Sequence, residues 1–179
     1  PKVLEAMLPY FIEHFGNAAS RSHSFGWQAE EAVDSAREQV AKLIGAEAQE
    51  IIFTSGATEG DNLAIKGVYE MYAGKGNHII TCVTEHKAIS DTCKHIEKLG
   101  GEVTYLKVHP DGLIDLKELE AAIKPTTILI AIMYANNETG VIQPVKEIST
   151  IAKKHGVLFF TDGTQAIGKI PVDVHKDGI

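Results

Sequence analysis

The sequence predicts an α/β fold, with a mostly parallel sheet and helices on both of its faces. Short apolar runs alternate along the chain with stretches in which apolar residues recur at helical spacing. The runs near residues 78–83 and 127–134 are almost wholly apolar, as is typical of strands buried on both faces. Because a strand, a helix and a following parallel strand form a right-handed crossover, this alternation favours a parallel sheet.

The N-terminal part of the chain is predicted to be helical. Residues 2–15 place an apolar stripe on one helical face, and Pro9 is expected to kink or interrupt that helix. Residues 15–26 are small and polar, and they are expected to form a long loop. A second helix is predicted over about residues 27–44, where Gly45 ends it.

From residue 51 onward, strands and helices are predicted to alternate. The strands are expected at about residues 51–54, 78–83, 102–108, 127–134 and 157–161. The helices are expected at about residues 61–72, 88–99, 115–124 and 144–155. Position 1 is Pro, and residues 172–179 stop on an incomplete alternating pattern, so we expect the chain to be a piece of a longer protein.

The composition is that of a soluble globular chain and excludes several classes of protein. A formal net charge of -7 without a cluster of Lys or Arg argues against nucleic acid or an anionic lipid surface as the main partner. No apolar run is long enough to cross a bilayer, and no signal peptide opens the chain. Cys82 and Cys93 fit neither a C-x-x-C motif nor a Cys/His metal pattern, which favours a reduced, cytoplasmic compartment and no metal site.

The stretch around Gly56 is the first candidate for a binding site. It is expected to join a strand to a helix N-terminus, where unpaired backbone N–H groups and the helix dipole favour a phosphate. Gly56 lets the backbone come close, and Ser55 and Thr58 offer hydroxyl groups. Plain helix capping by Thr58 is an alternative interpretation. Neither the P-loop motif nor the G-x-G-x-x-G motif is present.

Polar residues also follow the other predicted strands, at the edge where an open parallel sheet binds its ligands. They lie in the segments 84–87, 136–138 and 162–165. Singly, each has a structural interpretation, because His86 or Asp162 would serve as a cap and Asn137 would shape a turn. Together they suit a phosphorylated pyridine such as pyridoxal phosphate, since a carboxylate beside the ring nitrogen keeps it protonated.

Five blocks of the sequence carry a resemblance to a known family. They lie at residues 16–23, 54–62, 84–88, 136–140 and 162–165. These blocks resemble, in the right order, the signature blocks of cysteine desulfurases of the NifS/IscS type. Those enzymes are fold-type I, class V aminotransferase-like proteins that use pyridoxal 5'-phosphate (PLP). The resemblance covers essentially the whole chain.

The resemblance implies how the cofactor would be held. Ala57 and Thr58 would bind its phosphate, and Asp162 would pair with the ring nitrogen. His86 would stack on the ring and help to move protons. Asn137 and Gln165 would bond the phenolic oxygen side of the ring.

The resemblance also implies the reaction and the partners. Such enzymes take sulfur from L-cysteine, release L-alanine and leave a persulfide on a mobile cysteine. The sulfur then passes to a scaffold protein for iron–sulfur clusters or to an acceptor in tRNA modification. A homodimer is expected, because the active sites of fold-type I enzymes are completed across the dimer.

The chain departs from the family in three places. The family's cofactor-binding lysine lies in a Ser-Gly-His-Lys block that is absent here, and neither Lys169 nor Lys176 matches it. Neither Cys82 nor Cys93 aligns with the nucleophilic cysteine, and the N-terminal Ala-Thr-Thr-Pro turn is missing. We therefore expect residues 1–179 to be part of the large PLP-binding domain, without its N-terminal strand and the small C-terminal domain, and to be inactive alone.

Two other functions stay open. The same fold and cofactor would serve a selenocysteine lyase or another class V aminotransferase-like enzyme, although residues 85–87 and 136–138 favour the desulfurase. A chain without the lysine and the nucleophile would also serve as a non-catalytic, split-chain scaffold.

Overall fold

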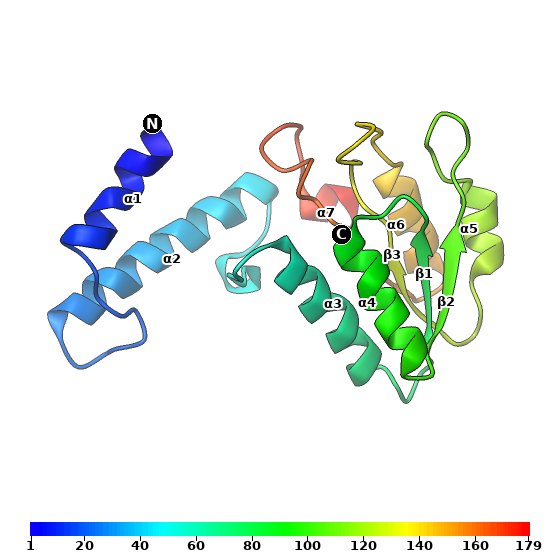
Figure 1. Ribbon diagram of the computed structural model, residues 1–179, viewed down its shortest axis with the longest axis horizontal. Coiled ribbons are helices and arrows are strands. Elements are labelled where there is room, and N and C mark those ends of the chain that lie inside the picture. Colours follow the sequence, from blue (N-terminus) through cyan, green and yellow to red (C-terminus); the bar gives the residue numbers. More distant parts are fainter. The chain divides into compact units, whose positions relative to one another are not determined.

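The computed structural model describes residues 1–179 and divides into two compact units, residues 1–52 and 53–179. Unit 1 consists of helix α1 (Lys2–Ile12), helix α2 (Ser24–Ile44) and a single 3-10 turn, η1 (Ala48–Glu50). Figure 1 draws these elements in blue and cyan. The two units are described separately.

The helices of unit 1 follow the predicted pattern with two differences. Helix α1 runs through Pro9 and continues to Ile12, so the expected interruption at Pro9 is wrong. Helix α2 begins three residues earlier than predicted, because the His23 side chain caps it by accepting a hydrogen bond from Gly26 N. Its predicted end at Gly45 is confirmed, where φ is 72°.

Unit 2 alternates helices and strands as predicted. Its strands are β1 (His78–Cys82), β2 (Glu102–Leu106), β3 (Thr127–Ala131) and β4 (Leu158–Phe160). Its helices are α3 (Ala57–Met71), α4 (Lys87–Lys98), α5 (Leu116–Ala122), α6 (Val145–Lys154) and α7 (Val174–Asp177). The strands form one sheet in the order β2-β1-β3-β4, and every pairing is parallel. The predicted α/β class with a parallel sheet is confirmed.

Helices cover both faces of this sheet; in Figure 1 α3 and α4 lie to the left of β1 and β2, and α5 lies to their right. On that face Ile65 of α3 and Ile89 of α4 pack with Ile79 of the sheet in one buried cluster. On the opposite face Leu119 of α5 and Ile148 of α6 belong to a second cluster. Burial of both faces explains why β1 and β3 are apolar along their whole length.

Two segments differ from what the sequence predicts. Residues 51–54 form no strand, because this extended stretch has no partner strand and leaves Ile52 72% exposed. An apolar run of this length does not distinguish a strand from an unpaired segment. Residues 172–179, for which no element was predicted, contain the short helix α7, capped by the Asp173 side chain.

The helix after residue 56 begins at Ala57, four residues before its predicted start. Ala57 and Thr58 therefore belong to the first turn of α3 and not to a loop. No helix of the chain has both the length and the apolar character needed to span a membrane.

Candidate functional site

The carboxyl ends of β1, β3 and β4 meet at one edge of the sheet, and hydrogen bonds join the segments that follow them. The Glu85 carboxylate accepts from Met133 N at 2.8 Å. The Asn136 amide donates to Thr84 O at 2.9 Å, and Tyr134 N donates to Asp162 O at 2.9 Å. Each of these hydrogen bonds joins two of the three segments. The segments are therefore held together at the edge where the sequence predicts a binding site.

The N-terminus of α3 offers two unpaired backbone donors. Its N-cap, Gly56, makes no side-chain capping bond, and the N–H groups of Ala57 and Thr58 have no hydrogen-bond partner in the chain. The Ser55 hydroxyl is already used, since it donates to the Glu59 carboxylate at 2.5 Å. Thr58 is thus not a cap, and the first turn of this 15-residue helix suits an anion.

His86 caps helix α4, which confirms the structural alternative weighed for it. Its Nδ1 accepts from Ala88 N at 3.1 Å, so a neutral ring carries its proton on Nε2. The imidazole is nevertheless exposed, and it lines a pocket of about 390 Å³ together with Thr58. Capping therefore fixes the ring while leaving Nε2 and the flat face accessible.

Asp162 lies two residues after the end of β4, and its exposed fraction is 9%. Its Oδ1 accepts from Thr164 N at 2.9 Å, so it also shapes the turn that follows. Asp61 of α3 lies within electrostatic reach of both Asp162 and His86. Thr58 and His86 thus line one pocket, and Asp61 connects them electrostatically with Asp162; that the three residues bind one ligand stays a prediction.

The other two predicted residues are not joined to this group by any contact. Asn137 is exposed and makes no hydrogen bond, while its neighbour Asn136 shapes the turn by accepting from Glu138 N and Thr139 N. Gln165 accepts a hydrogen bond from the Lys169 ammonium. The structure thus leaves the predicted roles of Asn137 and Gln165 as predictions.

Sequence reasoning missed two carboxyl groups at this edge, the buried Asp61 and the half-buried Glu85. Burial and the nearby Asp162 charge raise the pKa of Asp61 to about 6. Burial raises the pKa of Glu85 to about 8, although the bond from Met133 N opposes this. Helical spacing could have flagged Asp61, because it lies four residues before the buried Ile65 on the core face of α3.

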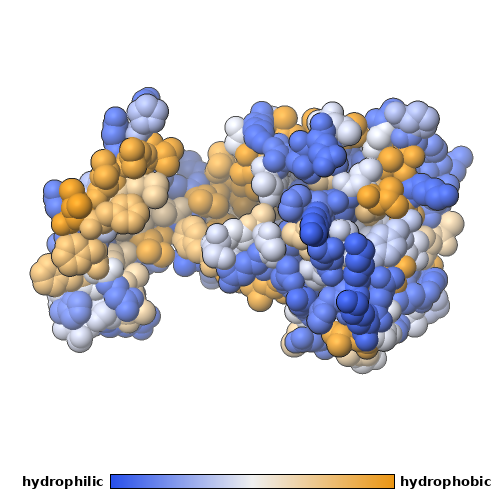
Figure 2. All heavy atoms as spheres, in the orientation of Figure 1, coloured by the Kyte–Doolittle hydropathy of each residue, from blue (hydrophilic) through white to orange (hydrophobic).

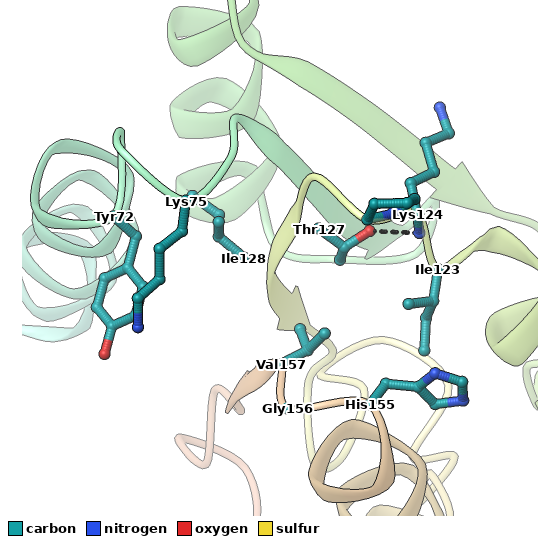
Figure 3. Close-up of a pocket in the computed structure, with 10 residues that line it drawn as sticks. Tyr72, Lys75, Ile123, Lys124, Thr127, Ile128, His155, Gly156 and Val157 are labelled. Carbon is teal, nitrogen blue, oxygen red and sulfur yellow. Dashed lines mark hydrogen bonds between the residues drawn. The ribbon is translucent and has the colours of Figure 1, made fainter.

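A second pocket, of about 440 Å³, lies at the opposite, amino edge of the sheet (Figure 3). Its cationic groups already have partners, since Lys124 pairs with Glu102, the His155 ring bonds Glu120 at 3.0 Å, and Lys75 lies over the Tyr72 ring. It therefore lacks the unpaired donors that the α3 N-terminus provides.

The chain offers neither a metal site nor an activated thiol. No group of three or more His, Cys, Asp or Glu residues is arranged to hold a metal ion. Cys82 and Cys93 are free and buried. Burial raises the pKa of both thiols, that of Cys93 to about 12, so neither is a nucleophile near neutral pH.

Comparison with known proteins gives a consistent result. The profile of the aminotransferase class-V family matches residues 1–179. The chain is 59% identical over 174 residues to a cysteine desulfurase IscS of Anaeromyxobacter sp. (strain K), which covers 97% of this chain and 43% of that protein. It is 58% identical over 179 residues to a cysteine desulfurase IscS of Rickettsia bellii (strain OSU 85-389), covering 100% of this chain and 44% of that protein.

Solved structures agree with the sequence relatives. A NifS-like protein superposes with a TM-score of 0.96 at 40% identity, over 99% of this chain and 49% of its own. The apo structure of a cysteine desulfurase from Thermococcus onnurineus NA1 gives a TM-score of 0.90 at 32% identity, over 99% of this chain and 44% of its own. The chain thus spans less than half the length of the curated relatives that it matches.

Proposed function

Because the chain belongs to the aminotransferase class-V family, we propose that it is the cofactor-binding part of a cysteine desulfurase that uses PLP. The observation that carries this proposal is the pair of unpaired N–H groups at Ala57 and Thr58, in the same neighbourhood as His86 and Asp162. A ligand that fits these residues has a phosphate at one end, for the N–H groups, and a ring that can be protonated at the other end, for Asp162.

We assign the cofactor contacts as follows. The first turn of α3, through Ala57 and Thr58, binds the phosphate. The Asp162 carboxylate faces the ring nitrogen and favours its protonated form. Asn137 and Gln165 are proposed to bond the phenolic oxygen side, which requires the Gln165 amide to turn from Lys169.

PLP supplies an electron sink for a carbanion formed at the substrate. The protein contributes proton transfer and orientation. Since the His86 Nδ1 is held by Ala88 N, we assign Nε2 as the atom of His86 that accepts and returns a proton. The capping bond keeps the imidazole in one orientation for this task.

The proposed overall reaction takes sulfur from L-cysteine, releases L-alanine and leaves a persulfide on an enzyme cysteine, from which a scaffold protein or another acceptor receives it. This chain supplies neither that cysteine nor the cofactor-binding lysine. Cys82 and Cys93 are buried, Lys169 bonds Gln165, and Lys176 pairs with Asp173 at 2.6 Å. We therefore propose that the 179-residue chain alone has no turnover.

We further propose that residues 1–179 are part of the large PLP-binding domain of a longer, cytoplasmic homodimer. The family's N-terminal strand and small C-terminal domain would then lie outside this chain. The relatives' length supports this, because the chain covers 43% and 44% of the two IscS proteins compared above.

The test uses the full-length protein that contains this chain. We expect it to bind PLP, seen by visible absorption, and to release alanine from L-cysteine. His86→Ala should slow alanine release by about 10²- to 10⁴-fold, the usual effect of removing a general acid–base group. His95→Ala is the matched control, because His95 is an exposed histidine of the same helix and lines the same pocket.

Three outcomes would contradict the proposal. Alanine release by the 179-residue chain alone would refute its predicted inactivity. Release of alanine only from selenocysteine would indicate the lyase instead. Failure of the full-length protein to bind PLP would favour the non-catalytic scaffold.

A further inference from the structure

Two carboxyl groups, the buried Asp61 and the half-buried Glu85, interact electrostatically with Asp162, the predicted partner of the ring nitrogen. Asp61, on the second turn of α3, is 4% exposed, and its Oδ2 is buried without any hydrogen-bond partner. Glu85 is held from the other side by the bond from Met133 N at 2.8 Å. A buried and unpartnered carboxylate oxygen is costly, so its retention needs a reason.

No ion pair of the chain compensates this group of acids, although His86 lies within electrostatic reach of Asp61. None of Asp61, Glu85 and Asp162 takes part in an ion pair with Lys, Arg or His. The side chains are not arranged to hold a metal ion either. Protons or a bound organic cation would supply positive charge that no ion pair of this chain provides.

Three carboxylates that share one desolvated edge do not all ionise. The groups that face Asp61 are Asp162 and His86. Those that face Glu85 are Asp162, Asp61 and the buried thiols Cys82 and Cys93. With a pKa of about 8, Glu85 is mostly neutral at pH 7, whereas Asp61, with a pKa of about 6, changes charge near that pH.

We propose that Asp61 and Glu85 are positioning residues that set the charge Asp162 presents to a cationic ring: Glu85 stays neutral, and Asp61 gives up its proton when the ring binds. This inference rests on the proposed function, because the cation it requires is the protonated pyridine of PLP. It assigns to Asp61 a proton-releasing role, which a residue that only caps or packs a helix would not have.

The physical reason for the proton release is electrostatic. A positive ring beside Asp162 attracts negative charge in the same low-dielectric edge, so the ionised form of Asp61 becomes favoured. At pH 6, where about half of the Asp61 side chains are protonated, binding should release up to about half a proton per site through this group. Glu85 should release none at that pH.

The experiment counts the protons released when PLP binds to the apo form of the full-length protein. Calorimetric titration in two buffers that differ in heat of ionisation gives this number at pH 6 and pH 8. We expect Asp61→Asn to release up to about half a proton less than the wild type at pH 6 and the same number at pH 8. Glu85→Gln should match the wild type at pH 6. Asp111→Asn, in an exposed turn, is the matched control.

A second measurement needs no cofactor, and its deciding result comes from the wild-type protein. The infrared spectrum of the wild-type apo protein should show a protonated carboxyl band at pH 7 that disappears as the pH rises past about 8, and Glu85→Gln should lack this band. Absence of the band in the wild type would overturn the inference.

The two proposals fail in different ways. PLP binding with equal proton release by the wild type and Asp61→Asn at pH 6 would overturn this inference and leave the proposed function intact. No PLP binding would overturn both proposals.

Discussion

The two units of the chain differ in what their apolar residues contact. In unit 2 the sheet is buried between two clusters, and residues such as Ile79, Ile130 and Ile148 are 0% exposed. In unit 1 helix α1 buries no residue, and Phe11 is 68% exposed. Figure 2 shows hydrophobic residues over much of the visible face of α1.

This difference teaches that an amphipathic pattern predicts a helix but not its partner. The apolar stripe over residues 2–15 correctly indicated α1, yet within this chain nothing covers the stripe. Unit 2 contains both sides of its core, so its pattern and its packing agree. We expect the two units to respond very differently to the same kind of substitution.

The largest expected effect is loss of a core side chain in unit 2. Ile130→Ala should lower the free energy of unfolding of unit 2 by about 2–5 kcal/mol, because it removes buried methyl groups and leaves a cavity. Leu8→Ala on α1 should change stability by less than about 0.5 kcal/mol, since Leu8 is 45% exposed. Urea unfolding followed by circular dichroism measures both. Equal losses would show that α1 is buried by contacts that this structure does not contain.

The elements of unit 2 could be predicted from the sequence because their periodicity reports burial directly. Strands β1 and β3 begin at the predicted residues, and Asp115 caps α5 as expected. The segment 51–54 could not be predicted, since its apolar residues give no information on whether a neighbouring strand exists. The start of α3 at Ala57 was missed because Gly56 replaces the usual side-chain cap.

A second prediction concerns a glycine of each unit that touches a backbone carbonyl. A Cβ on Gly76 would lie 2.2 Å from Thr126 O, and a Cβ on Gly26 would lie 1.7 Å from Ser20 O. Gly76→Ala should destabilise unit 2 as a whole by about 1–3 kcal/mol, because the strand-connecting backbone must shift. Gly26→Ala should instead open only the loop before α2, since no large core surrounds it.

Amide hydrogen exchange separates these two responses. Gly76→Ala should speed exchange throughout the sheet, whereas Gly26→Ala should speed it only over residues 17–26. Gly74→Ala is the control, because a Cβ there meets nothing within 4 Å. Global exchange in Gly26→Ala would mean that unit 1 is as cooperative as unit 2.

A third prediction uses a buried histidine, which unit 1 lacks, because His14 and His23 are exposed. His78 is 0% exposed, and both ring nitrogens are bonded, to Thr127 Oγ1 at 2.7 Å and to Thr104 Oγ1 at 2.9 Å. Burial, and then the nearby Lys124 charge, lower the pKa of His78, while Glu102 opposes this.

The sign of the pH effect follows from that lowered pKa. The unfolded chain binds a proton at His78 near pH 6.5, whereas the folded chain resists it, so this contribution to stability is present above pH 6.5 and is lost as the pH falls. Asp61 and Glu85 act in the opposite direction, since their raised pKa values favour the folded state at low pH. Unfolding free energies between pH 7 and pH 5 should therefore decline less in His78→Gln than in the wild type. An unchanged slope would contradict the prediction.

The candidate site shows the same limit of sequence reasoning at the level of single residues. The place of His86 and Asp162 after buried strands could be predicted, because polar residues there meet at one edge, while their roles stay predictions. The carboxyl groups of Asp61 and Glu85 were missed, since the effect of each depends on its surroundings; helical spacing indicates the burial of Asp61 but not its neighbours. The contacts of Asn137 and Gln165 depend on a ligand, so the chain by itself does not determine them.

The smallest expected effect concerns α7, which is only four residues long and yet is anchored, in contrast to α1. Ser149 of α6 is 6% exposed, and its hydroxyl donates to Gly178 O at 2.7 Å. Ser149→Ala should cost about 0.5–1.5 kcal/mol, at the low end of that range because Gly178 is exposed and water can replace the donor. The Ile179 amide, which donates to Val174 O at 2.8 Å, should then exchange faster. Thr150→Ala is the matched control, since the exposed Thr150 hydroxyl bonds only within α6, to Lys146 O at 2.8 Å. Equal exchange of Ile179 in the two variants would show that α7 is held by its other contacts, such as the bond from the Tyr134 hydroxyl to Asp177 at 3.3 Å, and not by this hydrogen bond.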